Sequence, residues 1–233
     1  RETAKIDAIF SPKTIAVVGA STRKGTVGND LFRNLIDHGF KGDVYPVNKK
    51  NPEVYGRKTY PTLADIPGEI DLAVLILPAK IVPFVLDEAI EKGVKAVVVI
   101  SAGFKETGAE GAAMEKAIAA KCQAAGMPLV GPNCLGVING DNDVRLNASF
   151  ATKIPDEGNL GFISQSGALC TSVLDYAEAR RMGFSKFISF GNKADVSEVD
   201  LLNYLAEDEK TSVIAMYLED ISDGAAFIQA ASR

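Results

Sequence analysis

The stretch Ile15-Ala-Val-Val-Gly-Ala-Ser-Thr-Arg-Lys-Gly-Thr-Val-Gly28 decides the fold of this chain. Its first four residues are all apolar, which predicts a buried strand without polar alternation. Gly19 ends that strand, and Val27 begins an amphipathic run with apolar residues at helical spacing. A strand, a glycine-rich turn and a helix together point free backbone N–H groups and a helix N-terminus at a phosphate group.

The turn departs from the dinucleotide pattern G-x-G-x-x-G. Ala20 stands where the second glycine would be, and the later glycines are Gly25 and Gly28. The motif therefore predicts a phosphate-bearing ligand without identifying it, and a tight strand–helix turn that binds nothing is the alternative. Residues with hydroxyl or cationic groups crowd this turn: Ser21, Thr22, Arg23 and Lys24.

Composition limits the class of protein. A chain of 233 residues, 47% hydrophobic and 24% charged, buries a substantial core and holds one or two domains. Its net charge of −5 argues against broad nucleic-acid binding, which needs a basic face. The apolar runs are far shorter than a membrane span, and the N-terminus lacks a secretory leader pattern.

The three cysteines form no C-x-x-C pair, which favours a reducing compartment and a cytoplasmic protein. The single histidine, His38, stands beside a glycine at a predicted helix end, where it favourably meets the helix dipole. Because no metal-ligand spacing accompanies the acidic residues, we expect no metal site. The absence of an initial Met and the end at Arg233 suggest a piece of a longer protein.

The first half of the chain alternates strands and helices. Five such repeats predict a parallel, doubly wound sheet, in which ligands bind at the carboxyl ends of the strands. The predicted strands cover residues 15–18, 43–47, 72–77, 96–100 and 129–130, and the predicted helices begin at Val27 and cover 82–92 and 110–125. Residues 6–12 are predicted to be a short lead-in segment before the first strand.

The end of the second predicted strand carries Asn48, Lys49 and Lys50. NAD-binding units usually have an acidic residue at this point, which holds the ribose hydroxyls. Cations there suit a ligand with an extra phosphate on its ribose, as in NADP and coenzyme A. A solvated lysine pair is the alternative.

The periodicity fails over residues 137–157, so we predict a domain junction near residue 145, giving domains 1–145 and 146–233. A strand over 159–163 then leads into Ser164-Gln-Ser-Gly167 and a helix, which forms a second anion cradle. Simple helix capping by Ser164 or Ser166 is the alternative. Further strands are predicted over 186–190 and 212–218, with helices over 199–205 and 224–231.

Seven short motifs occur along the chain in one order: Val18-Gly-Ala-Ser21, Tyr45-Pro-Val-Asn48, Leu77-Pro-Ala79, Ile100-Ser-Ala-Gly-Phe104, Gly131-Pro-Asn-Cys-Leu-Gly136, Ile163-Ser-Gln-Ser-Gly167 and Tyr217-Leu-Glu219. Together they resemble the NDP-forming acyl-CoA synthetases, namely the α part of ADP-forming acetyl-CoA synthetase and, more distantly, the α subunit of succinyl-CoA synthetase. The resemblance implies an α/β fold with a Rossmann-like CoA-binding domain followed by a flavodoxin-like ligase domain, truncated at its C-terminus.

The resemblance also implies roles for individual residues. The turn after the first strand would hold the CoA phosphates, Asn48 or Lys49 would meet the adenosine end, and later turns would contact the adenine, the pantetheine and the thiol end. The implied CoA-binding residues are Gly19, Ser21, Thr22, Arg23, Lys24, Asn48, Lys49, Pro78, Ala79, Ile100, Ser101, Ala102 and Asn133. The implied phosphoryl-binding residues are Ser164, Ser166 and Gly167, and Glu219 would orient a phosphohistidine.

In such enzymes acyl-CoA and phosphate yield an acyl-phosphate, a histidine takes the phosphoryl group, and ADP receives it on a separate ATP-grasp part. The implied ligands are coenzyme A or acyl-CoA, phosphate, and ADP or ATP with Mg on that ATP-grasp part. The implied partner is the ATP-grasp β part, fused or separate, in a hetero- or homo-oligomer. The histidine would lie downstream of Glu219, so we expect this chain to bind CoA without completing turnover.

Three other functions stay open. A lysine acetyltransferase with a degenerate synthetase region would carry the same two domains. A NADP-binding reductase would need a catalytic residue after the fourth or fifth strand, where Lys105 and Cys134 are the candidates. A CoA-binding switch protein would end near residue 135, and the second cradle and Glu219 argue against it.

Overall fold

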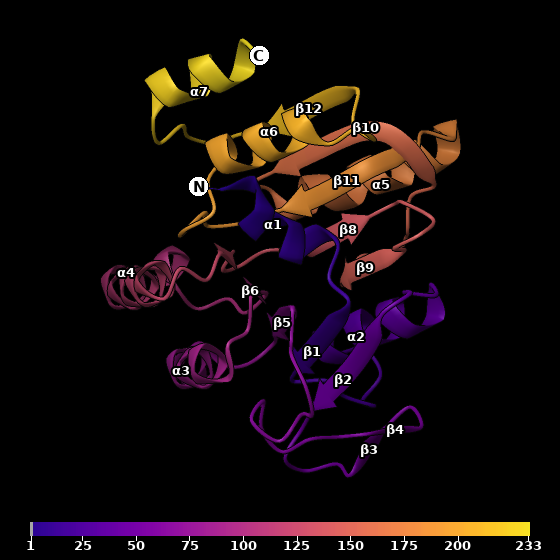
Figure 1. Cartoon of the computed structure of the whole chain (residues 1–233), viewed down its shortest axis with the longest axis vertical. Coiled ribbons are helices and arrows are strands. Elements are labelled where there is room, and N and C mark those ends of the chain that lie inside the picture. Colours follow the sequence, from indigo (N-terminus) through magenta and orange to yellow (C-terminus); the bar gives the residue numbers. More distant parts are fainter. Residues whose placement is uncertain (1) are drawn as a thin grey trace.

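The computed structural model describes residues 2–233, in which two five-stranded sheets share one core (Figure 1). The first sheet has the order β2-β1-β5-β6-β7 and is parallel throughout, which confirms the predicted doubly wound arrangement. Its strands are β1 (Thr14–Val18), β2 (Asp43–Val47), β5 (Leu72–Leu75), β6 (Ala96–Val99) and β7 (Leu129–Val130). The third and fourth strands end two and one residues earlier than predicted.

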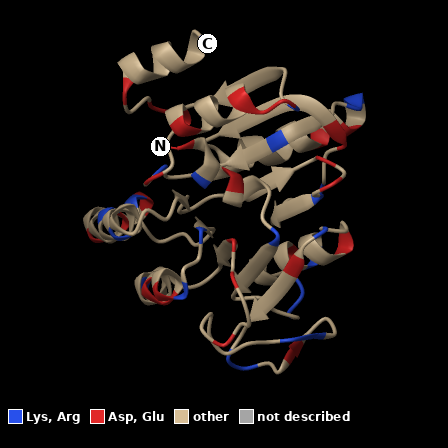
Figure 2. Cartoon of the chain, in the orientation of Figure 1, with Lys and Arg blue, Asp and Glu red and all other residues tan. Residues whose placement is uncertain are grey.

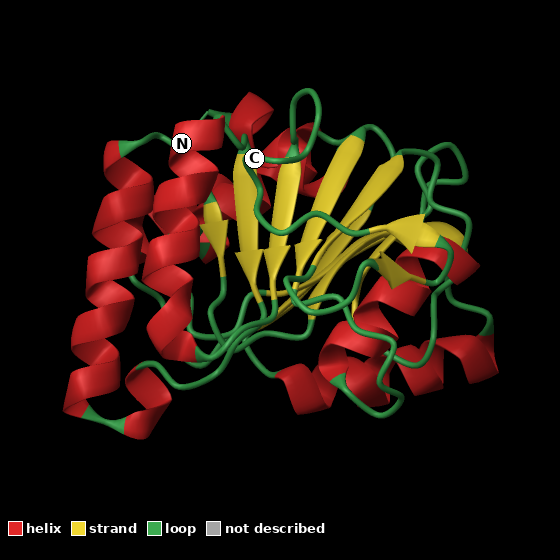
Figure 3. Ribbon diagram, turned by 90° about the horizontal axis from the view of Figure 1, so that it is seen from below, coloured by secondary structure: helices red, strands yellow, loops and turns green. Residues whose placement is uncertain are grey.

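Helices cover both faces of this sheet, as Figure 3 shows from a second direction. Ile15 and Val17 face a core shared with α1, α2 and the second sheet, whereas Ala16 and Val18 face α3 and α4. Because both faces of β1 are buried, its sequence is apolar at every position instead of alternating. The helices are α1 (Thr3–Phe10), α2 (Val27–Asp37), α3 (Val82–Lys92) and α4 (Ala109–Ala124), with short 3₁₀ turns at Ala79–Ile81 and Lys105–Thr107.

Helix α1 corrects the prediction of a short lead-in over residues 6–12. Ile6, Ile9 and Phe10 lie on one side of this helix and are fully buried, and the Phe10 ring stacks on Tyr204 with centroids 5.1 Å apart. No side chain caps the N-terminus of α1. An eight-residue helix without a cap is marginal by itself, so tertiary packing forms it, and local signals did not reveal it.

The second sheet has the order β12-β10-β11-β8-β9 and is mixed. The strands β10, β11 and β12 are parallel, and β8 and β9 add an antiparallel hairpin beside β11. The strands are β8 (Gly136–Asn139), β9 (Leu146–Ser149), β10 (Glu157–Ser164), β11 (Phe184–Ser189) and β12 (Val213–Tyr217), and the helices are α5 (Gly167–Arg180), α6 (Glu198–Glu207) and α7 (Gly224–Ala231).

The β8–β9 hairpin lies within residues 137–157, where the periodicity of the sequence fails and no strand is predicted. Both strands are wholly buried and contain polar residues, so their sequences show neither alternation nor a continuous apolar run. Asn139 illustrates the reason, because its side-chain amide donates to the Phe10 carbonyl inside the core at 2.9 Å. The second sheet therefore begins at Gly136, ahead of the junction predicted near residue 145, and the division into two domains stays a prediction.

A separate two-stranded hairpin, β3 (Glu53–Val54) and β4 (Arg57–Lys58), stands beside the first sheet. Its Val54 side chain is fully buried in the core that contains α2. No helix among residues 2–233 is long and apolar enough to cross a membrane.

Gly19 and Gly28 let strand β1 and helix α2 approach each other closely. A Cβ atom added at Gly28 would lie 2.1 Å from the Gly19 carbonyl oxygen, and one added at Gly19 would lie 2.1 Å from the Ile76 carbonyl oxygen. Gly19 also has a φ of +100°, which side chains rarely tolerate. Both glycines are therefore required by the strand–turn–helix geometry.

Replacing Gly28 by Ala tests this contact. We expect Gly28→Ala to lower the free energy of unfolding by about 1–3 kcal/mol, because the methyl group has no space between the turn and the helix. Denaturant unfolding followed by circular dichroism measures the change. Gly224→Ala is the matched control at the start of α7, where an added Cβ meets nothing within 4 Å. Equal unfolding midpoints for the two variants would contradict the close approach.

Candidate functional site

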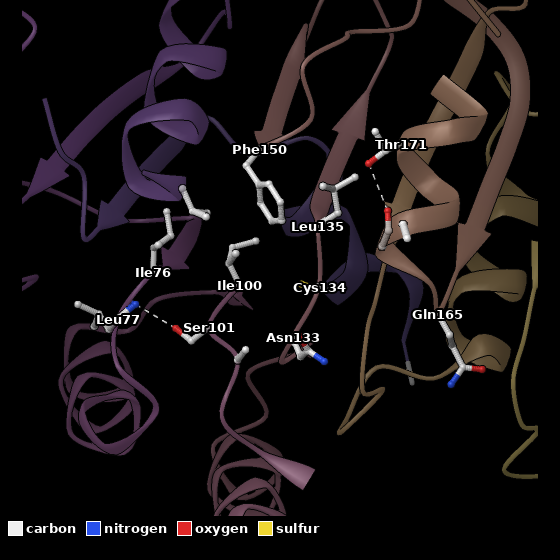
Figure 4. Close-up of a pocket in the computed structure, with 14 residues that line it drawn as sticks. Ile76, Leu77, Ile100, Ser101, Asn133, Cys134, Leu135, Phe150, Gln165 and Thr171 are labelled. Carbon is white, nitrogen blue, oxygen red and sulfur yellow. Dashed lines mark hydrogen bonds between the residues drawn. The ribbon is translucent and has the colours of Figure 1, made fainter. Parts of the chain in front are cut away.

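A cavity of about 670 Å³ lies between the two sheets, at the carboxyl ends of their strands (Figure 4). This is the edge at which the sequence predicted a ligand. The first sheet contributes the segments that follow β5, β6 and β7, and the second contributes Phe150 and the beginning of α5. The lining residues are Val27, Ile76, Leu77, Ile100, Ser101, Ala102, Asn133, Cys134, Leu135, Phe150, Gln165, Gly167, Ala168 and Thr171.

A second cavity of about 300 Å³ adjoins the first, because Leu77 lines both. It lies between the end of β2 and helix α3, and Gly19, Asn48 and Lys49 line it. Together the two cavities form an elongated site with one end at the lysine pair after β2 and the other between the sheets. Pro78 and Ala79 begin the 3₁₀ turn next to Leu77 and line neither cavity.

The turn after β1 exposes polar groups at the start of helix α2. The side chains of Thr22, Arg23 and Lys24 are exposed, and the Ser21 hydroxyl accepts a hydrogen bond from the Arg23 N–H at 3.0 Å. Thr26 caps the helix by accepting from the Asn29 N–H. In the described part of the chain no acceptor is found for the backbone N–H groups of Ser21 and Thr22.

The structure separates the roles of the two residues after β2. Asn48 has its side-chain groups occupied within the protein, because its amide donates to the Ala20 carbonyl at 2.8 Å and its oxygen accepts from two backbone N–H groups. Lys49 is exposed at the cavity rim. Cations gather around this end of the molecule (Figure 2). Among residues 2–233 no ion-pair partner is found for Arg23, Lys24, Lys49, Lys50, Arg57 and Lys58.

Ser101 and Asn133 support the wall of the larger cavity. The Ser101 hydroxyl accepts from the Leu77 N–H at 2.9 Å, and the Ser101 carbonyl accepts from the Asn133 N–H at 2.9 Å. Asn133 has a positive φ of 56°, and its amide donates to the Asn192 side chain at 3.2 Å. Ser101 therefore joins three strand ends, through its hydroxyl to the segment after β5 and through its backbone carbonyl to the segment after β7. Ile100 and Ala102 line the cavity beside it.

In the predicted second anion cradle, residues 164–167, both serine hydroxyls make hydrogen bonds within the protein. Ser166 caps α5 by accepting from the Leu169 N–H, and the buried Ser164 hydroxyl both donates to the Ser166 carbonyl and accepts from the Ser166 N–H. This is the geometry of the capping alternative, while phosphoryl binding stays a prediction. Gly167 and Ala168 line the cavity, and among the described residues their N–H groups have no acceptor.

A network of charged groups fixes the segment after β12. The Gln165 side-chain oxygen accepts from the Glu219 N–H at 2.7 Å, and its amide donates to Asp220 at 2.8 Å. The hydrogen bonds from Gln165 and, next, from Lys193 hold the pKa of Asp220 below its usual range. Lys193 is 4% exposed and also lies 3.0 Å from Glu198. The side chain of Glu219 remains exposed beside this network.

Comparisons with known proteins identify the two halves of the chain. Residues 13–140 match the family described as CoA binding domain, which is more than half of the chain. The chain belongs to the CoA binding domain family. Residues 157–233 match the Succinyl-CoA ligase like flavodoxin domain. These matches confirm the expected Rossmann-like and flavodoxin-like fold classes.

Similar proteins confirm the resemblance to the NDP-forming acyl-CoA synthetases. The ADP-forming acetate–CoA ligase I of Archaeoglobus fulgidus is 45% identical over 97% of this chain and 32% of the relative. The α subunit of the ADP-forming acetate–CoA ligase II of Pyrococcus furiosus is 45% identical over 98% of this chain and 49% of the relative. This member of the CoA binding domain family therefore spans about a third of the first relative and half of the second.

A solved structure agrees with nearly the whole of this chain. The acetyl-coenzyme A synthetase 1 of Candidatus Korarchaeum cryptofilum, in complex with phosphate and ADP, has a TM-score of 0.93 and 42% identity. The match covers 98% of this chain and 49% of that one. The arrangement of the two sheets around the cavity is thus shared with a synthetase.

Sequence reasoning missed Ile76 and Phe150 as cavity residues. Phe150 follows β9, a strand that the sequence did not predict, so no signal placed it at a carboxyl edge. The sequence predicts a strand that continues to Leu77 and so includes Ile76, whereas β5 ends at Leu75 and the next two residues line the cavity. The motif Leu77-Pro-Ala79 already marked this strand end as a turn.

The structure shows the environments of Cys134 and Lys105, the two candidate catalytic residues of a reductase. Burial raises the pKa of the Cys134 thiol to about 12, and its Sγ atom donates to the Val99 carbonyl at 3.4 Å. Lys105 donates to the Asn192 carbonyl at 2.5 Å and lies 3.9 Å from Glu115. The Cys134 thiol is buried and neutral, so it is a poor nucleophile. The Lys105 ammonium is already held by groups of the protein and is not free to act on a substrate.

We therefore expect the native chain to resist thiol reagents. Cys122, Cys134 and Cys170 are all buried, and burial also raises the pKa of Cys170 to about 11. Since the thiolate is the reactive form, iodoacetamide at pH 8 should label none of the three cysteines in the native chain and all three in 6 M guanidinium. Mass spectrometry of the intact chain counts the labels. Rapid native labelling at Cys134 would contradict this environment.

Proposed function

We propose that this chain is the CoA-binding and ligase portion of an ADP-forming acyl-CoA synthetase. The parent reaction would convert acyl-CoA, ADP and phosphate into a carboxylic acid, CoA and ATP, in either direction. The observation that carries the proposal is the pair of adjoining cavities, which share Leu77 and extend from the unpaired cations near Lys49 to the mostly apolar cavity between the sheets. Such a site suits a ligand with phosphates at one end and an acyl thioester at the other.

In this proposal the charged end of CoA lies at the turn after β1. The N–H groups of Ser21 and Thr22, the N-terminus of α2 and the side chains of Arg23 and Lys24 would bind the diphosphate. Lys49 would meet the ribose phosphate, because the Asn48 side chain is occupied within the protein. The pantetheine would pass Ile100 and Ala102, and the thiol end would lie near Asn133.

The larger cavity would hold the reacting acyl group. Its described lining contains apolar side chains and a few neutral polar ones, and no Lys, Arg or His. A second carboxylate on the acyl group would be buried there without a cation, which is costly. We therefore propose a monocarboxylic acyl group, with the N–H groups of Gly167 and Ala168 facing the phosphoryl group and Glu219 beside it.

The remaining chemistry would require groups beyond those described. His38, the single histidine of this sequence, lies at the C-terminus of α2 with its Nδ1 atom 2.9 Å from the Asn34 carbonyl. A helix that follows a parallel strand ends at the opposite edge of the sheet from the site, so His38 is not the phosphoryl carrier. We propose that another histidine and an ATP-grasp part, which binds ADP or ATP with Mg, complete the enzyme, and that this chain alone is inactive.

A titration with CoA tests the proposed function, with NADP as the parallel ligand. We expect the chain to bind CoA and not NADP. Ser21→Glu should weaken CoA binding roughly tenfold or more, since a negative charge beside the diphosphate costs about 1.4 kcal/mol or more. Isothermal calorimetry measures both ligands. Ser232→Glu is the matched control, on an exposed residue after α7.

The possible results separate the candidate functions. Binding of CoA that Ser21→Glu weakens tenfold or more and Ser232→Glu preserves supports a CoA site at this turn, as the synthetase requires. Binding of NADP without CoA would overturn it in favour of a reductase.

Phe150 is the expected limit of the acyl pocket. Its ring lies between Leu135 and Ile100 in Figure 4, and the backbone on either side of it is held by Asn34, which donates to the Ser149 and Ala151 carbonyls at 2.8 and 2.7 Å. Because the backbone is fixed from α2, the ring has little freedom to move aside. A larger acyl group would therefore compete with Phe150 for space.

We expect Phe150→Ala to shift preference toward longer acyl groups. Each additional buried methylene contributes about 0.8 kcal/mol, or roughly a fourfold gain in affinity, once the ring is removed. Calorimetry with acetyl-, butyryl- and hexanoyl-CoA measures the ratio of affinities. Phe84→Ala, on the exposed face of α3, is the control. An unchanged order of affinities in Phe150→Ala would remove Phe150 from the acyl pocket.

A further inference from the structure

The tip of the β3–β4 hairpin holds a tyrosine in a conformation that disfavours it. Tyr55 and Gly56 have φ values of +50° and +75°, which belong to a two-residue hairpin turn that normally prefers Asn or Gly at the first position. A bulky residue with a positive φ is uncommon and points to a role for its side chain.

Tyr55 extends from the hairpin onto helix α2. Its ring stacks on Phe32, with centroids 6.5 Å apart and planes 15° from parallel, and the Arg33 guanidinium lies 6.0 Å from the ring centre. Its hydroxyl accepts a hydrogen bond from the Asn29 side-chain amide at 2.5 Å. The ring contacts therefore hold the hydroxyl over the first turn of α2.

Asn29 transmits this contact to the turn after β1. The Asn29 side chain is 2% exposed, and its amide also donates to the Ser21 carbonyl at 3.0 Å. The neighbouring Ala20 carbonyl accepts from the Asn48 amide at 2.8 Å. Two consecutive carbonyls of the turn are thus held by side-chain amides from two different elements.

This arrangement decides where the N–H groups of the turn point. In a trans peptide the C=O and N–H bonds are antiparallel. Because the carbonyls of Ala20 and Ser21 point toward Asn48 and Asn29, the N–H groups of Ser21 and Thr22 point away from these amides. Those are the two N–H groups for which the described residues supply no acceptor.

We propose that Asn29, Asn48 and Tyr55 form a clamp that presents the N–H groups of Ser21 and Thr22 to the diphosphate of CoA. Tyr55 is a positioning residue in this clamp, because it keeps the Asn29 amide directed at Ser21 without itself touching the ligand. The proposal rests on the proposed function, which places the diphosphate at this turn. It gives the β3–β4 hairpin, which joins neither main sheet, a part in ligand binding.

Tyr55→Phe tests the clamp, because it removes the hydroxyl and keeps the ring that stacks on Phe32. We expect it to weaken binding of CoA and of dephospho-CoA about fivefold each, the effect of one neutral hydrogen bond. Binding of pantetheine, which lacks the diphosphate, should not change. Calorimetry measures CoA and dephospho-CoA, and NMR titration measures pantetheine. Tyr176→Phe, which removes an exposed hydroxyl on α5, should leave all three affinities unchanged.

A second measurement uses the chain without ligand. Amide NMR resonances of Ser21 and Thr22 should shift in Tyr55→Phe and stay in place in Tyr176→Phe. Unchanged CoA affinity together with unshifted resonances would overturn the clamp, and so would an equal loss for pantetheine, which indicates a general structural role. A wild type that binds no CoA would overturn the proposed function. In that case the Ser21 and Thr22 resonances of Tyr55→Phe would still test whether Tyr55 positions this turn.

Discussion

The contact between Gly28 and the Gly19 carbonyl is the constraint on which the site depends. Without side chains at these positions, α2 begins directly over the end of β1. Three functional features of α2 follow from that approach. Val27 enters the cavity wall, Asn29 reaches the turn, and Asn34 holds the backbone around Phe150. One backbone contact thereby sets the position of both the proposed phosphate end and the proposed acyl end.

The cavity exists because the two sheets interlock at their carboxyl edges. The segment after β11 lies against the segment after β7, where the Asn192 N–H donates to the Pro132 carbonyl and the Ala194 N–H to the Gly131 carbonyl. The Asn192 amide also donates to Glu106 and Glu115, both from the first half of the chain. Partial burial raises the pKa of Glu106, but the hydrogen bonds that it accepts from Asn192 and from backbone N–H groups hold this pKa below its usual range. The walls are therefore fixed relative to each other.

The sequence predicted the elements that carry their own local signals and missed those formed by tertiary packing. Strand β2 and helix α3 match their predicted bounds, because apolar runs between glycines and turn residues mark both ends. Helix α1 is short and has no N-terminal cap, so its sequence carries no clear helix signal. The β8–β9 hairpin buries polar residues, so its sequence lacks the hydrophobic periodicity of a strand. At the site, the sequence identified the turns but not how their side chains are used. Asn48, Ser101 and Ser164 carry donors and acceptors that the fold itself occupies.

Gln165 connects the cavity with the acid predicted to act beside it. The residue lines the cavity, and its side-chain oxygen holds the Glu219 N–H. Its amide is bound in turn to Asp220, whose position is fixed by the buried Lys193 and its partner Glu198. A buried lysine is tolerated here because the buried Glu198 carboxylate compensates its charge at 3.0 Å and Asp220 adds a second contact at 3.2 Å. Movement of the wall at Gln165 would therefore also move the backbone of Glu219, so that the cavity and the acid respond together.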